Sequence, residues 1–183
     1  MSEIETKISA VETSSEDLIK ILMTVVNQYT SDLDAIMYGV ERDILQTPNP
    51  AIYTIEQYFL NLSSCLYFMC EKVEKLGIYD SISKSKAQET YNNSYLKYQY
   101  NNTEDKKKPT VAELTALSEQ DALYDKTVND LYSKAYKVVK NKISAAETMI
   151  NTLSKILSHR VQESQMTVSQ TGRQILNESE EYF

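Results

Sequence analysis

Apolar residues recur every three or four positions through most of this chain, which is the spacing of a helix with one buried face. The first series follows "SSED", where serine and the acidic Glu16 and Asp17 favour a helix N-terminus. It ends at "TPNP", whose prolines cannot continue a helix. The pattern predicts a helix whose apolar face consists of Leu18, Ile21, Leu22, Val25, Tyr29, Leu33, Ile36, Met37, Val40 and Ile44.

A second apolar series begins just after Pro50, a residue that favours the first turn of a helix. Gly77 is a natural helix stop, and we expect this helix to end there. Because the connection between the first two helices is short, they are predicted to form an antiparallel hairpin over about residues 15–77. The second apolar face consists of Ile52, Ile55, Phe59, Leu62, Leu66, Met69, Val73 and Leu76.

Residues 80–100 carry a third, less apolar series that is formed mostly by tyrosines. Its members, Ala87, Tyr91, Tyr95 and Tyr98, again have helical spacing. The polar stretch "NNTEDKKKP" follows, and we interpret it as a linker that Pro109 closes.

The longest series begins after this linker, where Thr110 and Glu113 form a capping box. It predicts one dominant helix over about residues 110–165, although Asp121 falls inside the stripe and a break near "SEQD" is an alternative. Its repeat is close to seven residues, which favours coiled-coil packing within the chain or against another copy. Since the stripe from Leu114 to Leu157 needs more cover than the shorter helices offer, we expect a homo-oligomer.

The composition favours an all-α fold, because the chain has only three glycines and three prolines for turns. We expect an N-terminal helical hairpin and one long C-terminal helix with coiled-coil-like oligomer packing. The predicted organisation is a flexible acidic arm (1–13), the hairpin and tyrosine-striped helix (14–100), the linker (101–109), the long amphipathic helix (110–165) and a polar tail (166–183).

Charge is distributed unevenly along the chain. The whole sequence has 26 acidic and 19 basic residues, for a net charge of −7. Between Lys134 and Arg160 the balance reverses, since Glu147 is the only acidic residue there. Such segregation is typical of a binding surface or of two parts that attract each other. The candidate nucleic-acid-binding residues are Lys134, Lys137, Lys140, Lys142, Lys155, Arg160, Tyr132 and Tyr136.

A helical wheel divides these basic residues into two groups. Lys134, Lys137, Lys140 and Lys155 lie off the apolar stripe, as solvated lysines do. Lys142 and Arg160 fall in the middle of the stripe. A cation there needs an acidic partner, a route to solvent or an anionic ligand. The acidic N-terminal helix and an oligomer seam are two alternatives for that partner.

The sequence offers few candidate residues for enzymatic catalysis. The chain has one histidine, and no metalloprotease, dinucleotide or P-loop motif occurs. We therefore expect no enzyme, no cofactor and no metal. No segment reaches the apolar length of a membrane span, and the acidic "MSEIE" is unlike the basic lead of a signal peptide, so a cytoplasmic protein without a membrane partner is expected.

The second half of the chain, from about residue 85 to 165, resembles the UvsY-type recombination mediators of tailed phages. The resemblance rests on the Lys-rich "KKKP", on "SEQDALY" and on the long helix that ends near Arg160. It implies a small helical accessory protein of phage replication in the host cytoplasm. Such proteins bind single-stranded DNA, form homo-oligomers and load a recombinase onto strands coated by single-strand-binding protein. The lysines would then contact phosphates and the tyrosines would stack on bases.

A different class of protein fits the same helices. A long amphipathic helix and a hairpin are also typical of a non-enzymatic phage structural, assembly or adaptor protein. A helical inhibitor of a host protein is a third alternative. Exposure of the lysines on one surface would favour DNA binding, whereas their pairing with acidic residues of the first helix would favour assembly.

Overall fold

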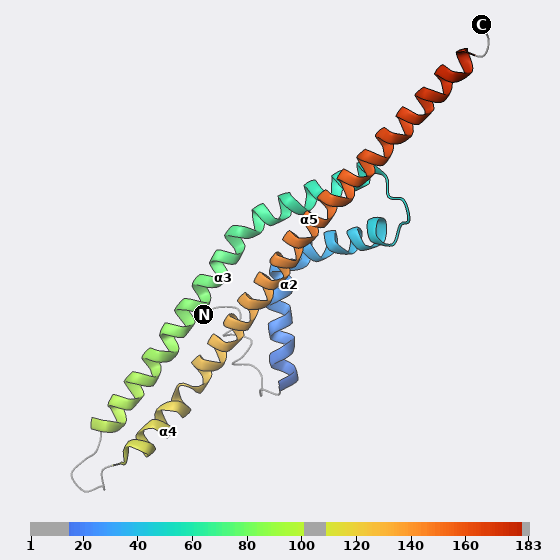
Figure 1. Cartoon of the computed structure of the whole chain (residues 1–183). Coiled ribbons are helices and arrows are strands. Elements are labelled where there is room, and N and C mark those ends of the chain that lie inside the picture. The colour runs from blue at the N-terminus through green and yellow to red at the C-terminus, as the bar shows by residue number, and fades with distance from the viewer. Residues whose placement is uncertain (1–14, 101–108, 181–183) are drawn as a thin grey trace. The chain divides into compact units, whose positions relative to one another are not determined.

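Helices form nearly all of the computed structural model, which describes residues 15–100 and 109–180 and their side chains up to residue 169. The elements in chain order are α2 (Ser15–Val40), the π-helix η1 (Glu41–Leu45), α3 (Ile52–Tyr100), α4 (Val111–Asp121) and α5 (Leu123–Glu180) (Figure 1). No strand occurs in these two ranges, so the predicted all-α class is confirmed. The predicted acidic arm and nearly all of the linker lie outside the described residues.

The first helix begins and ends close to the predicted positions. α2 starts at Ser15, with Glu16 and Asp17 in its first turn. It continues into η1, which closes with a 3.0 Å hydrogen bond from the Gln46 backbone N–H to the Glu41 carbonyl oxygen. Residues 46–51 are not helical and include both prolines of "TPNP", as expected from their missing N–H groups.

The predicted end of the second helix at Gly77 is wrong. α3 runs without interruption from Ile52 to Tyr100, so the tyrosine-striped segment continues the same helix. Gly77 does not have the positive φ of a helix-terminating glycine. Instead it gives space to a neighbour, since a Cβ at this position would lie 3.2 Å from Cε2 of Tyr136. The glycine therefore serves close helix packing.

The C-terminal helices confirm the predicted capping box and the alternative in which the long helix is interrupted near "SEQD". The Thr110 backbone N–H donates to Oε2 of Glu113 at 2.7 Å, and the Glu113 N–H donates to Oγ1 of Thr110 at 3.3 Å. α4 ends at Asp121, and α5 begins after the single residue Ala122. Helix α5 then extends to Glu180, so that most of the predicted polar tail is helical.

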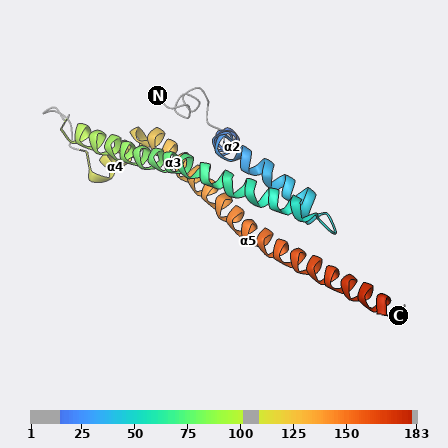
Figure 2. The same cartoon turned by 90° about the horizontal axis from the view of Figure 1, so that it is seen from above.

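The chain divides into two compact units. Unit 1 comprises Met1–Thr30 and Met69–Asn141, and unit 2 comprises Ser31–Phe68 and Lys142–Phe183. In unit 1, α3 lies antiparallel beside α4 and the start of α5 (Figures 1 and 2). Its buried apolar side chains are Ile21, Val25, Val26, Met69, Val73, Leu76, Ala87, Leu114, Ala122, Val128, Leu131, Tyr132, Ala135 and Val139.

Unit 2 contains the second part of α2, η1, the first part of α3 and the second part of α5. Tyr58 of α3 donates a hydrogen bond to Asp43 of η1, so these two elements are in contact across the proline-containing connection. The buried apolar residues of unit 2 are Leu33, Val40, Ile44, Ile55, Leu62, Ala146 and Leu153. None of the described helices has the apolar stretch that crossing a bilayer would require.

Candidate functional site

The lysines of the predicted basic segment fall into both units. Lys134, Lys137 and Lys140 are exposed on α5 in unit 1, and Lys155 is exposed on α5 in unit 2. None of the four has an acidic partner among the described residues; Lys140 lies over the ring of Tyr136, with Nζ 5.2 Å from the centroid. These side chains are therefore solvated, as their position off the apolar stripe predicts.

The two tyrosines predicted to stack on bases take part in helix packing. Tyr132 is only 7% exposed, and its ring stacks on Tyr79 of α3 with centroids 5.6 Å apart. Tyr136 is half-buried and packs against Gly77. Burial, with Tyr79 and Tyr132 nearby, also raises the pKa of Tyr29 in α2. The ring of Tyr132 is thus engaged in packing between α3 and α5.

Lys142 has an acidic partner on the first helix, as one of the two alternatives anticipated. Its Nζ lies 2.6 Å from Oδ2 of Asp34 in α2, and both side chains are about one-third exposed, at 32% and 34%. Both residues belong to unit 2. The ion pair lets a cation occupy the middle of the apolar stripe, and it gives Lys142 a part in holding α5 on α2.

Arg160, the other cation in the stripe, is held by polar neighbours within unit 2. Its Nη1 donates to Oε2 of Glu163 at 2.9 Å and to Oδ1 of Asn49 at 3.4 Å. Its Nε is buried and has no hydrogen-bond partner among the described residues. The only histidine, His159, has Nδ1 3.4 Å from Oε1 of the same Glu163.

A polar layer crosses the interface of α3 and α5 in unit 1. Asn129 donates through Nδ2 to the Asp80 carbonyl oxygen at 3.2 Å and to Oγ of Ser83 at 3.1 Å. Asp125 accepts a 2.6 Å hydrogen bond from Oγ1 of Thr90 and pairs with Nζ of Lys86 at 3.1 Å. These bonds satisfy polar groups that would otherwise be costly in a helix interface.

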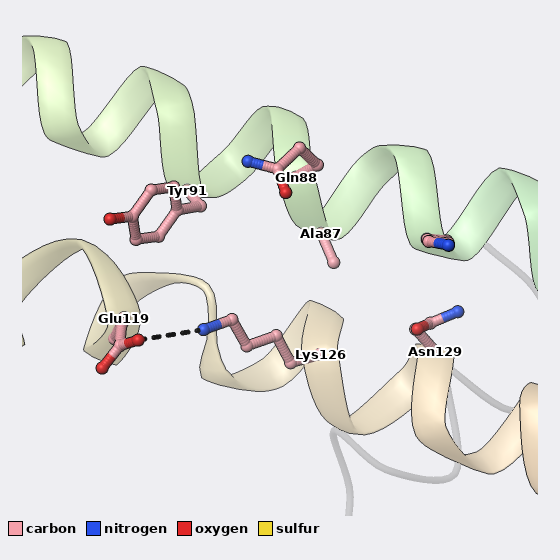
Figure 3. A pocket seen from close by; sticks show the side chains of 7 residues that line it. Ala87, Gln88, Tyr91, Glu119, Lys126 and Asn129 are labelled. Carbon is pink, nitrogen blue, oxygen red and sulfur yellow. Dashed lines mark ion pairs between the residues drawn. The ribbon is translucent and has the colours of Figure 1, made fainter. Parts of the chain in front are cut away.

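A cavity of about 290 Å³ opens beside this layer (Figure 3). Lys126 extends into it, 3.7 Å from Oε1 of Glu119 and with Nζ 5.5 Å from the ring centroid of Tyr91. Glu119 thus pairs with one of the two lysines that line the cavity. The lining residues are Lys84, Ala87, Gln88, Tyr91, Glu119, Lys126 and Asn129.

Ionisable side chains of the described residues were compared with the arrangements that hold metal ions. No group of three or more His, Cys, Asp or Glu side chains among the described residues is placed to hold a metal ion. A cluster of ionisable groups joins Arg42, Asp43 and Tyr58 in unit 2. Asp43 accepts from Nε and Nη2 of Arg42 at 2.6 and 2.9 Å and from the Tyr58 hydroxyl at 2.5 Å. The hydrogen bonds from Arg42 and Tyr58 hold the pKa of Asp43 well below its usual range.

The most distinctive open surface lies on α3 in unit 2. Four large side chains there are exposed, and we call them the α3 outer face: Tyr53 (69%), Leu60 (57%), Tyr67 (75%) and Phe68 (67%). Rings of Tyr67 and Phe68 meet edge to face, with centroids 5.3 Å apart. The opposite side of the same helix buries Ile55 and Leu62 completely. Helix α3 is thus apolar on two sides.

This face was not anticipated from the sequence. Tyr53, Leu60 and Tyr67 are spaced by seven residues, each two positions before a member of the buried series Ile55, Leu62 and Met69. The sequence signal that could have identified this face is the presence of two heptad series of apolar residues on one helix. By contrast, the stripe on α4 and α5 that was expected to require an oligomer is largely covered within the chain, since Leu114, Val128, Leu131, Ala135 and Leu153 are buried.

Comparison with known proteins gave no match to a family model, to a curated protein or to a solved structure.

Proposed function

We propose that this protein is a non-enzymatic helical assembly or adaptor protein, which acts by packing the α3 outer face against another protein chain. The observation that carries the proposal is the exposure of four large apolar side chains on one side of a helix whose other side is a core. Exposed aromatic clusters of this kind are typical of binding surfaces, and tyrosine is enriched among the residues that contribute most to binding.

The neighbouring contacts support the same function. Lys142 pairs with Asp34 of α2, and Tyr132 and Tyr136 are engaged with α3. The Lys142–Asp34 pair stabilises unit 2, which carries the α3 outer face, and the two tyrosines stabilise unit 1. An assembly protein needs such a rigid support, because binding then orders few additional groups.

Photo-crosslinking tests this proposal in cells that produce the protein. A photoreactive phenylalanine derivative replaces Tyr53 or Tyr67, and the same derivative at the exposed Asn151 of α5 is the control in unit 2. We expect a defined crosslinked product from positions 53 and 67 and none from position 151. Absence of any product from positions 53 and 67 would overturn the proposed function.

Single-stranded DNA binding, with recombinase loading as the family resemblance implies, is the second candidate. It is favoured by the exposed lysines Lys134, Lys137 and Lys140, which have no acidic partner among the described residues. With Tyr132 buried, such binding would depend mainly on phosphate contacts and would fall steeply with salt.

Titration with fluorescent oligo-dT at low and moderate salt tests this second candidate. Alanine at Lys134, Lys137 and Lys140 together should reduce the slope of log K against log salt by about 2, from roughly 0.7 per phosphate contact on single strands. Lys20, Lys75 and Lys97 offer a control triple in the same unit that removes equal charge. No binding at low salt would remove the candidate.

A further inference from the structure

We propose that the α3 outer face pairs with the same face of a second copy of this chain, so that two α3 helices lie antiparallel about a two-fold axis near Leu60. The inference rests on the proposed function and specifies its partner. It is carried by three features of the segment Ile52–Phe68: its near absence of charge, the symmetry of its exposed residues and the area that they offer.

The segment Ile52–Phe68 contains a single charged residue, Glu56, in a chain that is 25% charged. A helix that stays in water on its outer side normally carries charged residues there. A lipid surface is a poor fit, because helices that lie on membranes carry lysine and arginine beside their apolar face, and this segment has neither. An uncharged protein surface is the better occupant, and an identical segment provides one.

The exposed residues are arranged symmetrically along the helix. Tyr53 and Tyr67 each lie seven residues from Leu60. In an antiparallel pair centred on Leu60, this leucine faces Leu60 of the partner subunit, and Tyr53 faces Tyr67 of the partner subunit. Such self-complementarity is the requirement for a two-fold interface. The seven-residue spacing also matches the packing of two helices at a small crossing angle.

The single charge selects the antiparallel orientation. With Leu60 on the axis, Glu56 lies opposite Ser64 of the partner subunit, an uncharged and small residue. A parallel pair would place Glu56 against Glu56 of the partner subunit, and like charges in contact across an interface are unfavourable. Gln57 and Ser64, which lie between the apolar positions, add no charge to either arrangement.

The area is compatible with a dimer of modest affinity. An aromatic side chain contributes about 150–250 Å² when it is buried, so the four exposed residues offer roughly 500 Å² per copy. A standard interface buries about 800 Å² per partner, and the flanking polar positions would have to contribute the rest. Dimerisation in the micromolar range is therefore expected.

Sedimentation velocity of the full chain over a range of micromolar concentrations is the first test. The wild type should pass from monomer to dimer, and Leu60→Glu should weaken dimerisation by about 100-fold, as charge in the centre of an interface does. Asn151→Glu, which adds the same charge at an exposed position of the same unit, should leave it unchanged. Circular dichroism should show equal helicity for all three proteins. A wild type that stays monomeric at every concentration would overturn the inference.

Disulfide trapping then tests the orientation in the full chain with Cys65 and Cys70 replaced by serine. Leu60→Cys should form a disulfide-linked dimer on its own. Tyr53→Cys and Tyr67→Cys should each remain monomeric alone and crosslink when mixed. Self-crosslinking of Tyr53→Cys would indicate a parallel pair and overturn the antiparallel arrangement.

The crosslinked product from positions 53 and 67 separates this inference from the proposed function. A product that consists of two copies of this chain supports both. A product with a different protein supports the proposed function and overturns the homodimer. No product at all overturns both.

Discussion

Gly39 of α2 and Tyr58 of α3 approach so closely that a side chain at position 39 would collide with the tyrosine. A Cβ built on Gly39 would lie 2.5 Å from the Tyr58 hydroxyl oxygen and 2.7 Å from Cε1 of its ring. The same hydroxyl donates to Asp43, which follows on η1. The glycine thus leaves space for the tyrosine ring beside α2, from where its hydroxyl reaches the carboxylate.

Gly39→Ala is expected to destabilise unit 2 in spite of the better helix propensity of alanine. The change should gain up to about 1 kcal/mol of helix propensity, but it should displace Tyr58 and break its hydrogen bond to the charged Asp43. We expect the free energy of unfolding, measured by urea titration, to fall by about 1 kcal/mol. In a Tyr58→Ala background the same substitution should become stabilising, and a loss of equal size in both backgrounds would show that the contact is unimportant.

Asp43 should make the free energy of unfolding depend on pH in the acidic range. Its pKa in the folded chain is depressed, chiefly by hydrogen bonds from Arg42 and then from Tyr58. Its contribution is therefore present at neutral pH and is lost as pH falls below its unfolded value of about 4. Asp43→Asn should lower stability at pH 7 and reduce the decline between neutral and strongly acidic pH. Urea midpoints measured across this range check it, and parallel curves for both proteins would contradict it.

Reversing the Lys142–Asp34 pair in two steps tests whether it holds α5 on α2. Lys142→Asp should destabilise unit 2 by about 1 kcal/mol or more, because two carboxylates then face each other, and the partial exposure of both groups limits the size of the effect. Asp34→Lys in addition should recover most of the loss. Chemical denaturation of the single and double variants provides the measurement, and additive losses would show that the two residues do not interact.

Asp125→Ala should cost about 2 kcal/mol, since it removes the carboxylate that accepts from the hydroxyl of Thr90 and pairs with Lys86 in the α3–α5 interface. Asp130→Ala, on the exposed side of the same helix, should change stability by less than about 0.5 kcal/mol. Thermal unfolding of both variants compares them directly. Similar effects at the two positions would mean that the polar layer does not contribute.

Local signals in the sequence identified the helix ends near Ser15, at the prolines and at Thr110, but not the contacts between residues far apart in the sequence. The capping box at Thr110 and the prolines after η1 act through their own backbone groups, so their effects are readable from adjacent residues. The prediction that a helix ends at Gly77 was wrong because this glycine makes space for Tyr136, a residue far away in the sequence. A wheel placed Lys142 in the stripe, but only the structure identifies Asp34 as its partner.

The candidate site was harder to predict for a related reason. Periodicity identifies apolar positions but does not say which of two apolar sides a neighbouring helix covers. On α3 the side with Ile55 is buried and the side with Leu60 is exposed, and both have the same spacing. Similarly, the sequence alone does not show that the ring of Tyr132 stacks on Tyr79 and so takes part in helix packing.

The polar layer between α3 and α5 has a consequence for the alignment of the two helices. Apolar heptads repeat, so an interface made only of them would tolerate a slip of seven residues with little loss. Such a slip in either direction would take Asn129 away from Asp80 and Asp125 away from Thr90, leaving buried polar groups without partners. The hydrogen bonds of this layer therefore select one register among several that the apolar residues alone would allow.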